Sequence, residues 1–295
     1  MMRKIIAYVC ALMVLAPSLW AQSAMPFLRA DRNPATAAMG GAQLVSGLYN
    51  PAAVPFTGSD VVLSYQNWAP SSVHTTQINL LGGVKLGEKL GVTVLAAYQM
   101  GEEYTAMDAS GNLGASFRPS DLVAGLGAGY AFTRSLSAGV NLKFARMGVA
   151  SDASYNAFAA DVYVMYAAGA LKVSGGISSI GTGIKSGQNS YGLPTSATAG
   201  ASYDLGFGTS AVKVAADLDY YFAGGVGAVL GAQYAFRDLV FVRAGYHLGG
   251  GKAPIPSCVS LGAGFKFAGF HLDVGFLTAS ATLGNTLNVG VGYSF

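Results

Sequence analysis

The chain has 295 residues, of which 52% are hydrophobic and only 11% are charged. Soluble domains carry about 25% charged residues, and disordered chains are poor in aromatic residues, so the composition excludes a disordered protein. A bundle of membrane-spanning helices is also disfavoured, because no apolar run of about 20 residues occurs beyond position 24. The formal net charge of +3 gives no indication of nucleic-acid binding.

Residues 1–21 have the pattern of a secretory signal peptide. A basic start at Arg3 is followed by an apolar stretch and by small residues. We expect cleavage after Ala21, with a site as late as Ala24 as an alternative. Retention as a membrane anchor is the competing interpretation, but the apolar stretch is short for a span.

From residue 60 onward, apolar residues alternate with small or polar ones, which is the period of a β-strand with two different faces. Most segments have 9 to 13 residues, enough to cross a bilayer at a tilt. Lipid offers no hydrogen bonds to open edges, so such a sheet must close. We therefore predict an all-β fold, a transmembrane antiparallel β-barrel of about 14 strands over residues 60–295. The segments are 60–68, 73–86, 90–101, 121–132, 135–147, 155–168, 170–180, 195–205, 209–222, 225–237, 239–249, 256–267, 269–280 and 283–295.

The connections support a membrane barrel over a soluble β-sandwich or a secreted β-solenoid. A sandwich exposes a charged face, whereas here the second face is mostly Gly, Ser, Thr and Asn. Connections on one side are short, as at 237–238, and those on the other include the long stretches 102–120 and 181–194. This asymmetry is typical of barrels in the outer membrane of a Gram-negative bacterium, with lipid as their surroundings and both termini in the periplasm.

The inward parity of the strands carries six basic and five acidic residues, whose signs nearly cancel. An ion-selective pore usually has a ring of one sign, so we expect these charges to pair across the lumen as scaffold. The other inward positions are rich in glycine, which permits close backbone approach. We therefore expect residues 22–59 to fill the lumen as an N-terminal plug. The predicted lumen charges are Lys85, Lys143, Asp161, Lys172, Asp204, Lys213, Asp217, Asp219, Arg243, Lys266 and Asp273.

No pattern in the sequence indicates catalysis, a cofactor or a bound metal. His247 and His271 share the inward parity of their strands, so a metal site across the wall is one interpretation and hydrogen-bonded lumen histidines are the favoured one. Ser260 and His271 can be drawn as a hydrolase pair, but no G-x-S-x-G elbow occurs. After signal cleavage, Cys258 is the one cysteine left, which excludes an internal disulfide.

The predicted plug carries the most distinctive words in the chain: F-L-R, then A-A-M-G-G-A, then N-P-A. In these words, and in the fourteen-stranded layout that ends in an aromatic residue, the sequence resembles the PorV/PorQ family of outer-membrane proteins, which is related to the FadL-like barrels. The resemblance implies that the segment plugs the barrel from the periplasmic side. The spacer at 43–48 is shorter than is usual in that family and lacks its acidic residues. The plug motif consists of Phe27, Leu28, Arg29, Ala38, Met39, Gly40, Gly41, Asn50 and Pro51.

Two functions are compatible with these patterns. The PorV/PorQ resemblance implies a non-enzymatic accessory of type IX protein secretion, which binds secretion-machinery or cargo proteins through the loops at 102–120 and 181–194. The alternative is a FadL-like passive channel for small hydrophobic molecules. In that interpretation Leu113, Phe117 and Tyr191 of the long loops line an entry pocket.

Overall fold

The computed structural model describes residues 23–69, 75–107, 110–151, 153–251, 253–278 and 285–295. The predicted signal peptide lies outside the described residues. None of the helices within the described ranges is long and apolar enough to cross a membrane.

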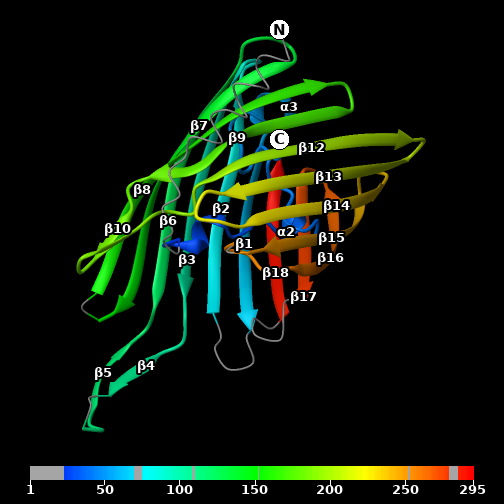
Figure 1. Ribbon diagram of the computed structural model, residues 1–295. Coiled ribbons are helices and arrows are strands. Elements are labelled where there is room, and N and C mark those ends of the chain that lie inside the picture. The colour runs from blue at the N-terminus through cyan, green and yellow to red at the C-terminus, as the bar shows by residue number, and fades with distance from the viewer. Residues whose placement is uncertain (1–22, 70–74, 108–109, 152, 252, 279–284) are drawn as a thin grey trace.

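A closed barrel of fourteen antiparallel strands forms the body of the protein (Figure 1). Each strand pairs with its neighbour in the chain, and β1 closes the barrel against β18, where Asp60 lies opposite Ser294. The prediction of an all-β, fourteen-stranded barrel is confirmed. The barrel strands are β1 (Asp60–Ala69), β2 (Thr75–Leu86), β3 (Leu90–Met100), β6 (Ser120–Ala131), β7 (Leu136–Ala150), β8 (Ala153–Ala168), β9 (Leu171–Gly181), β12 (Ser196–Phe207), β13 (Ser210–Tyr221), β14 (Val226–Phe236), β15 (Val240–Gly250), β16 (Cys258–Phe267), β17 (Phe270–Thr278) and β18 (Asn285–Ser294).

The two faces of the barrel differ as the alternation requires. Leu126, Leu142 and Phe158 point outward and are 65–68% exposed, as expected for side chains in contact with lipid. Inward residues such as Asn79 and Ser137 are fully buried. Burial inside a barrel this small requires material in the lumen, since an empty pore would leave these side chains accessible.

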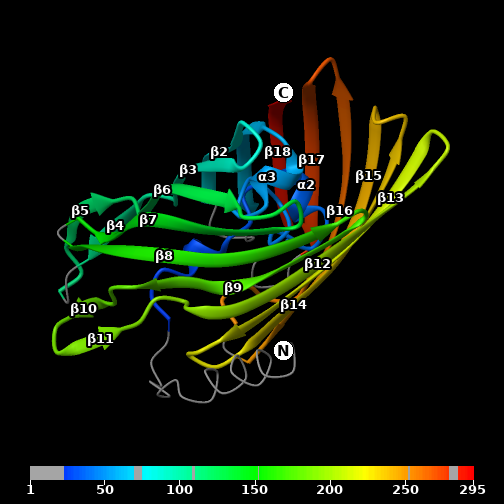
Figure 2. The ribbon, with the colours of Figure 1, turned by 90° about the horizontal axis from the view of Figure 1, so that it is seen from above.

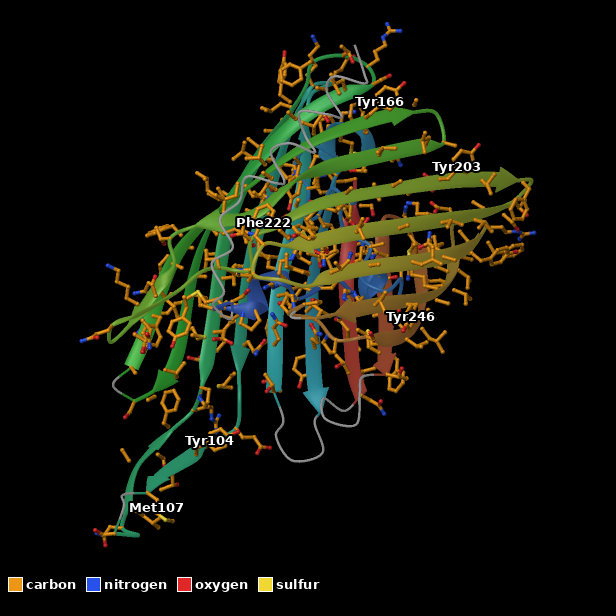
Figure 3. The ribbon with its side chains drawn as sticks, in the orientation of Figure 1. Tyr104, Met107, Tyr166, Tyr203, Phe222 and Tyr246 are labelled. Atoms are coloured by element: carbon orange, nitrogen blue, oxygen red, sulfur yellow. The ribbon has the colours of Figure 1, made fainter. Side chains whose placement is uncertain are left out.

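Two small hairpins extend the connections at one end of the barrel. β4 (Tyr104–Met107) pairs with β5 (Leu113–Phe117), and this hairpin projects far from the wall, with Tyr104 and Met107 along it (Figures 1 and 3). β10 (Ile184–Ser186) pairs with β11 (Asn189–Tyr191). Because long loops mark the extracellular side, we assign this end to the cell surface and the short turns to the periplasm.

Residues 23–59, which precede β1, lie inside the barrel (Figure 2). It contains a 3₁₀-helix, η1 (Pro26–Arg29), and two one-turn helices, α2 (Pro34–Ala37) and α3 (Val54–Thr57). The α2 turn begins where the Asn33 side chain accepts a hydrogen bond from the Ala35 amide at 3.1 Å, with Pro34 at the first helical position. The rest of this segment is irregular, so its backbone polar groups need partners from the barrel wall.

Candidate functional site: the plugged lumen

The plug runs along the whole length of the lumen. At one end, the Ala24 amide donates to the Gly192 carbonyl at 2.8 Å, in the extracellular connection before β12. At the other end, Val54 packs against Gly91 of β3, close to a short periplasmic turn. The PorV/PorQ resemblance implies plugging from the periplasmic side, whereas in the structure the plug reaches the extracellular end as well.

Glycines of the wall allow this close packing. A Cβ atom added to Gly129 of β6 or to Gly139 of β7 would collide with the backbone at Pro51 and Ala52 of the plug. On the opposite wall, a Cβ atom on Gly245 of β15 would collide with the plug backbone in the same way. The inward-facing glycines therefore leave room for the plug backbone to lie directly against the barrel wall.

Polar wall side chains then bind the plug backbone. The Asp217 carboxylate accepts hydrogen bonds from the amides of Gln43 and Leu44, at 2.7 and 3.1 Å. The Asn141 side-chain amide donates to the Tyr49 carbonyl at 2.8 Å. Such bonds supply partners that irregular backbone cannot find within itself.

A buried ion pair joins the plug to the wall. Arg29, the last residue of η1, approaches Asp219 of β13 to 2.6 Å, and its guanidinium lies over the Tyr221 ring at 5.7 Å. The side chains of Arg29 and Asp219 are only 14% and 10% exposed. Removal of one partner would leave the other charge buried without its counterion.

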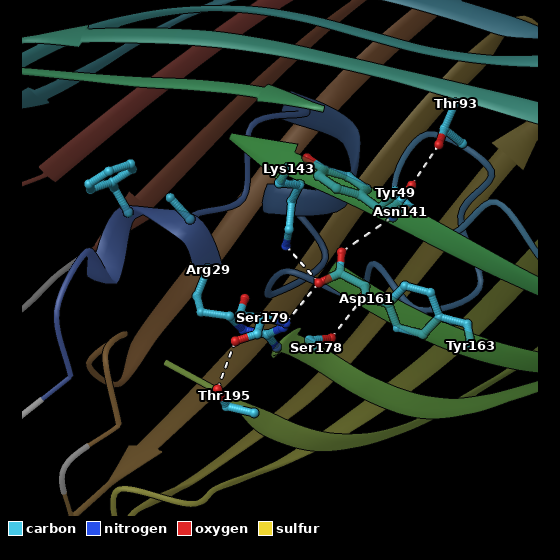
Figure 4. Close-up of polar contacts among 12 residues, drawn as sticks. Arg29, Tyr49, Thr93, Asn141, Lys143, Asp161, Tyr163, Ser178, Ser179 and Thr195 are labelled. Carbon is cyan, nitrogen blue, oxygen red and sulfur yellow. Dashed lines mark hydrogen bonds and ion pairs between the residues drawn. The ribbon is translucent and has the colours of Figure 1, made fainter. Parts of the chain in front are cut away.

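Beside Arg29, a second polar cluster surrounds Asp161 of β8 (Figure 4). Its carboxylate lies 2.7 Å from the Lys143 ammonium, and it accepts hydrogen bonds from the Ser179 amide at 2.8 Å and from Asn141 at 3.3 Å. Thr195 donates to the Ser179 carbonyl at 2.7 Å, which ties the start of β12 to the same point.

This cluster coincides with a β-bulge. The register of β8 against β9 shifts between Ala160 and Val162, and Ser179 has a φ of +55°. Ile177 and Ile180 both point outward, 39% and 42% exposed, although they differ in parity. The bulge therefore turns two consecutive residues, Ser178 and Ser179, toward the lumen, where Asp161 satisfies the Ser179 amide.

Most of the predicted lumen charges contact residues of nearby strands or of the plug. Arg243 lies 2.6 Å from Asp273, and Asp204 lies 3.3 Å from Lys172 and 3.5 Å from Lys213. Lys266 reaches Asp238 of a periplasmic turn at 3.2 Å, and Lys85 is exposed at the periplasmic end of β2. Opposite charges therefore do pair, but the partners lie on nearby strands of the inner wall or on the plug, and not on opposite sides of an open pore.

The structure keeps the two lumen histidines apart. His247 lies against the Gly40 carbonyl at 3.2 Å, and His271 lies between Asp60 and Asp273 at 2.9 and 2.7 Å. Within the described ranges, no group of three His, Cys, Asp or Glu side chains is placed to hold a metal. Ser260 accepts a hydrogen bond from the Gly40 amide at 2.8 Å and so serves to hold the plug.

The lumen also contains apolar clusters, a feature that sequence reasoning missed, and the one with the most residues lies at the extracellular end. Small inward residues of neighbouring strands, among them Ala97, Ala145 and Ala157, form a buried cluster with Phe27 and Leu28 of η1. The β10–β11 hairpin and the residues after it complete this cluster at the extracellular end. The sequence does carry a signal, because alanine occupies the inward positions 97, 145, 157 and 159 of β3, β7 and β8, but the alternation identifies these residues as small rather than as apolar.

Small cavities remain between the plug and the wall. One, of about 50 Å³, lies among Arg29, Arg32, Tyr49 and Lys143. A larger one, of about 210 Å³, lies beside Met39.

No protein-family model matches the sequence. No curated protein matches it either. Solved structures do match: the toluene transporter TbuX of Ralstonia pickettii has a TM-score of 0.58 at 11% identity, covering 90% of this chain and 98% of that one. TodX of Pseudomonas putida, also a toluene transporter, has a TM-score of 0.58 at 12% identity, covering 90% and 98%. The monoaromatic hydrocarbon channel CymD has a TM-score of 0.58 at 14% identity, covering 90% and 97%.

The fold is that of the outer-membrane hydrocarbon channels. A closed barrel of this kind places the protein in the outer membrane of a Gram-negative bacterium, in contact with its lipid. At these identities the likeness extends to the fold alone.

Proposed function

We propose that the protein is a FadL-like passive channel that admits small hydrophobic molecules through the outer membrane. The observation that carries the proposal is the apolar cluster at the extracellular end, which has more residues than the other apolar clusters described in the lumen. Its surface includes Ala145, Ala157 and Ala159, and Phe27 and Leu28 now cover it. An uncharged solute gains free energy from such a surface at about 25 cal/mol per Å² of apolar area buried. The fold shared with hydrocarbon channels supports the same solute class.

Passage requires the plug to yield, because Phe27 and Leu28 are buried in this cluster. Displacement of η1 is opposed by the Arg29–Asp219 ion pair, so release of this contact is the step that admits a solute. A solute that replaces Phe27 on the alanine surface would exchange one apolar contact for another, which offsets the loss of that part of the plug's packing.

Uptake of a radiolabelled monoaromatic hydrocarbon into proteoliposomes tests the proposal. We expect a higher initial rate than in empty liposomes, and a large loss of that excess in Ala157→Asp, which puts a charge in the apolar cluster. Ser202→Asp is the matched control, since Ser202 is also buried and faces the lumen but lies outside the cluster. A wild-type rate equal to that of empty liposomes would refute the channel.

A role as a type IX secretion accessory is the second proposal, carried by the F-L-R, A-A-M-G-G-A and N-P-A words. These words are buried: Phe27 is 8% exposed, Met39 6% and Asn50 1%. They therefore support a shared plug design more directly than a surface for cargo. Deletion of the gene tests this role. Proteins that bear the type IX C-terminal signal should then fail to reach the cell surface, and unchanged secretion would exclude the role.

A further inference from the structure

The lipid-facing wall at β6, β7 and β8 carries a groove of about 660 Å³. Its lining is apolar and includes Leu126, Leu142 and Phe158. Ala124 and Ala160 lie in the same outward rows, and their short side chains leave the space that the larger neighbours enclose. On this face the surroundings are membrane hydrocarbon, so an acyl chain is the material that fills such a groove.

A cation stands directly above this groove. Arg146 of β7 is exposed and shares the outward parity of Leu142 and Phe144. Since β-strands rise about 3.4 Å per residue, its Cα lies roughly 7 Å beyond that of Phe144, toward the extracellular end. Asn156 of β8 lies directly opposite Arg146 in the same row and is also exposed. Along the outward face, the apolar pair Phe144 and Phe158 is thus followed directly by the polar pair Arg146 and Asn156.

Arg146 has little to neutralise it within the described part of the chain. Its Nη2 lies 3.5 Å from the Ser154 hydroxyl, and no described carboxylate forms an ion pair with it. Arg118 of the neighbouring loop, by contrast, lies 3.5 Å from Glu103. A guanidinium that points outward at the membrane boundary is placed to meet an anionic headgroup, because the membrane itself is the source of anions there.

We propose that this face is a binding site for a phosphorylated, acylated lipid of the outer leaflet. One acyl chain lies in the groove between Leu142 and Phe158, and a phosphate of the headgroup accepts hydrogen bonds from Arg146 and Asn156. The planar guanidinium suits two phosphate oxygens at once. A neutral hydrocarbon would account for the groove alone, and a free phosphate for the arginine alone.

The side chains proposed to bind the lipid, those of Arg146, Asn156 and Phe158, point away from the lumen, so lipid binding is measured separately from the proposed channel. Native mass spectrometry of the full barrel in detergent tests it, titrated with lipid A, with dephosphorylated lipid A and with inorganic phosphate. We expect a defined one-to-one complex with lipid A, and affinities at least tenfold lower for the other two probes.

Three variants separate the two halves of the site. Arg146→Gln should lower the affinity for lipid A about tenfold or more, since it removes a charge-assisted hydrogen bond to the phosphate. Ala160→Phe should lower it by filling the groove. Ala244→Phe, on the far wall, is the matched control, because Ala244 also faces outward. Arg118→Gln controls for loss of charge at the same rim.

The outcomes decide the proposal, provided that each variant shows the heat-modifiable gel migration of a closed barrel. Loss of binding in Arg146→Gln and Ala160→Phe, with both controls intact, supports the site. Equal binding by all variants would show that the lipid is merely annular and would overturn it. Equal affinity for dephosphorylated lipid A would overturn the assignment of the phosphate to Arg146.

Discussion

Arg29 of the plug and Asp219 of strand β13, which are 190 positions apart in the chain, form an ion pair of 2.6 Å. The pair lies inside the lumen, where neither side chain is more than 14% exposed. It fixes η1 beneath the extracellular end of the barrel, so that Phe27 and Leu28 stay on the apolar cluster. The same contact therefore controls access to the surface on which the proposed channel depends.

Replacement of Arg29 by alanine should loosen the upper plug without unfolding the barrel. Removal of one member of a buried pair costs about 3–5 kcal/mol, because the other charge remains buried. We expect hydrogen exchange of the amides around η1 to accelerate by roughly two orders of magnitude or more in Arg29→Ala. Arg237→Ala, at an exposed turn, is the control.

The double variant Arg29→Ala/Asp219→Asn checks the cause. If the loosening arises from an unpaired Asp219 carboxylate, neutralising that group should restore part of the protection. A double variant that exchanges as fast as Arg29→Ala alone would show that lost packing, and not the buried charge, is responsible.

Asp217 should act locally on the middle of the plug. Asp217→Ala removes the acceptor of two buried amide hydrogen bonds, each worth about 1 kcal/mol. We expect faster exchange at the amides of Gln43 and Leu44 and unchanged exchange around η1. Asp238→Ala provides the contrast, since its ion pair with Lys266 is mostly exposed and contributes about 0–1 kcal/mol. Uniform acceleration along the plug in Asp217→Ala would contradict a local role.

The positions of the barrel strands were predictable from the sequence because two-residue periodicity is imposed by the membrane itself. Lipid contacts one face at every second residue, so Leu142 and Phe144 reveal the outward row and Lys143 the inward one. Each of the fourteen predicted segments corresponds to one barrel strand. The small hairpins in the extracellular connections were not predicted from the sequence. At β5 all residues but the last are exposed, so no buried face imposes a two-residue period.

The interior was less predictable, for two physical reasons. Parity identifies an inward residue but not its partner: nothing in the sequence pairs Asp219 with Arg29, since the contact depends on where an irregular segment folds. The bulge at Ser179 also reverses the alternation of β9. Ile177 and Ile180 both face the lipid, although strict alternation would place residues three positions apart on opposite faces. A period-based prediction carries no information about such a shift.

Close backbone packing in the periplasmic half of the plug can be tested with a single methyl group. Gly129→Ala would place a Cβ atom against the Pro51 carbonyl, which belongs to backbone and cannot swing aside. We expect the plug around Pro51 to be displaced, at a cost of about 1–3 kcal/mol in plug docking. Gly206→Ala is the control, because no atom outside its chain neighbours lies within 4 Å of the added Cβ. Limited proteolysis at 50–58 reports the displacement, and equal resistance of both variants would contradict the tight contact.

The outward face of strand β14 offers a test of membrane depth. Leu230 is 59% exposed near the middle of this strand, and Val226 is 42% exposed at its extracellular end. Arginine costs about 2–4 kcal/mol at the bilayer midplane of a barrel and about 0–1 kcal/mol near the interface. Leu230→Arg should therefore lower the free energy of unfolding in lipid vesicles by about 2–4 kcal/mol, and Val226→Arg by much less. Denaturant titration with tryptophan fluorescence measures both values. Equal losses would mean that the two residues do not differ in depth, and the strand would then have to run along the membrane surface rather than through it.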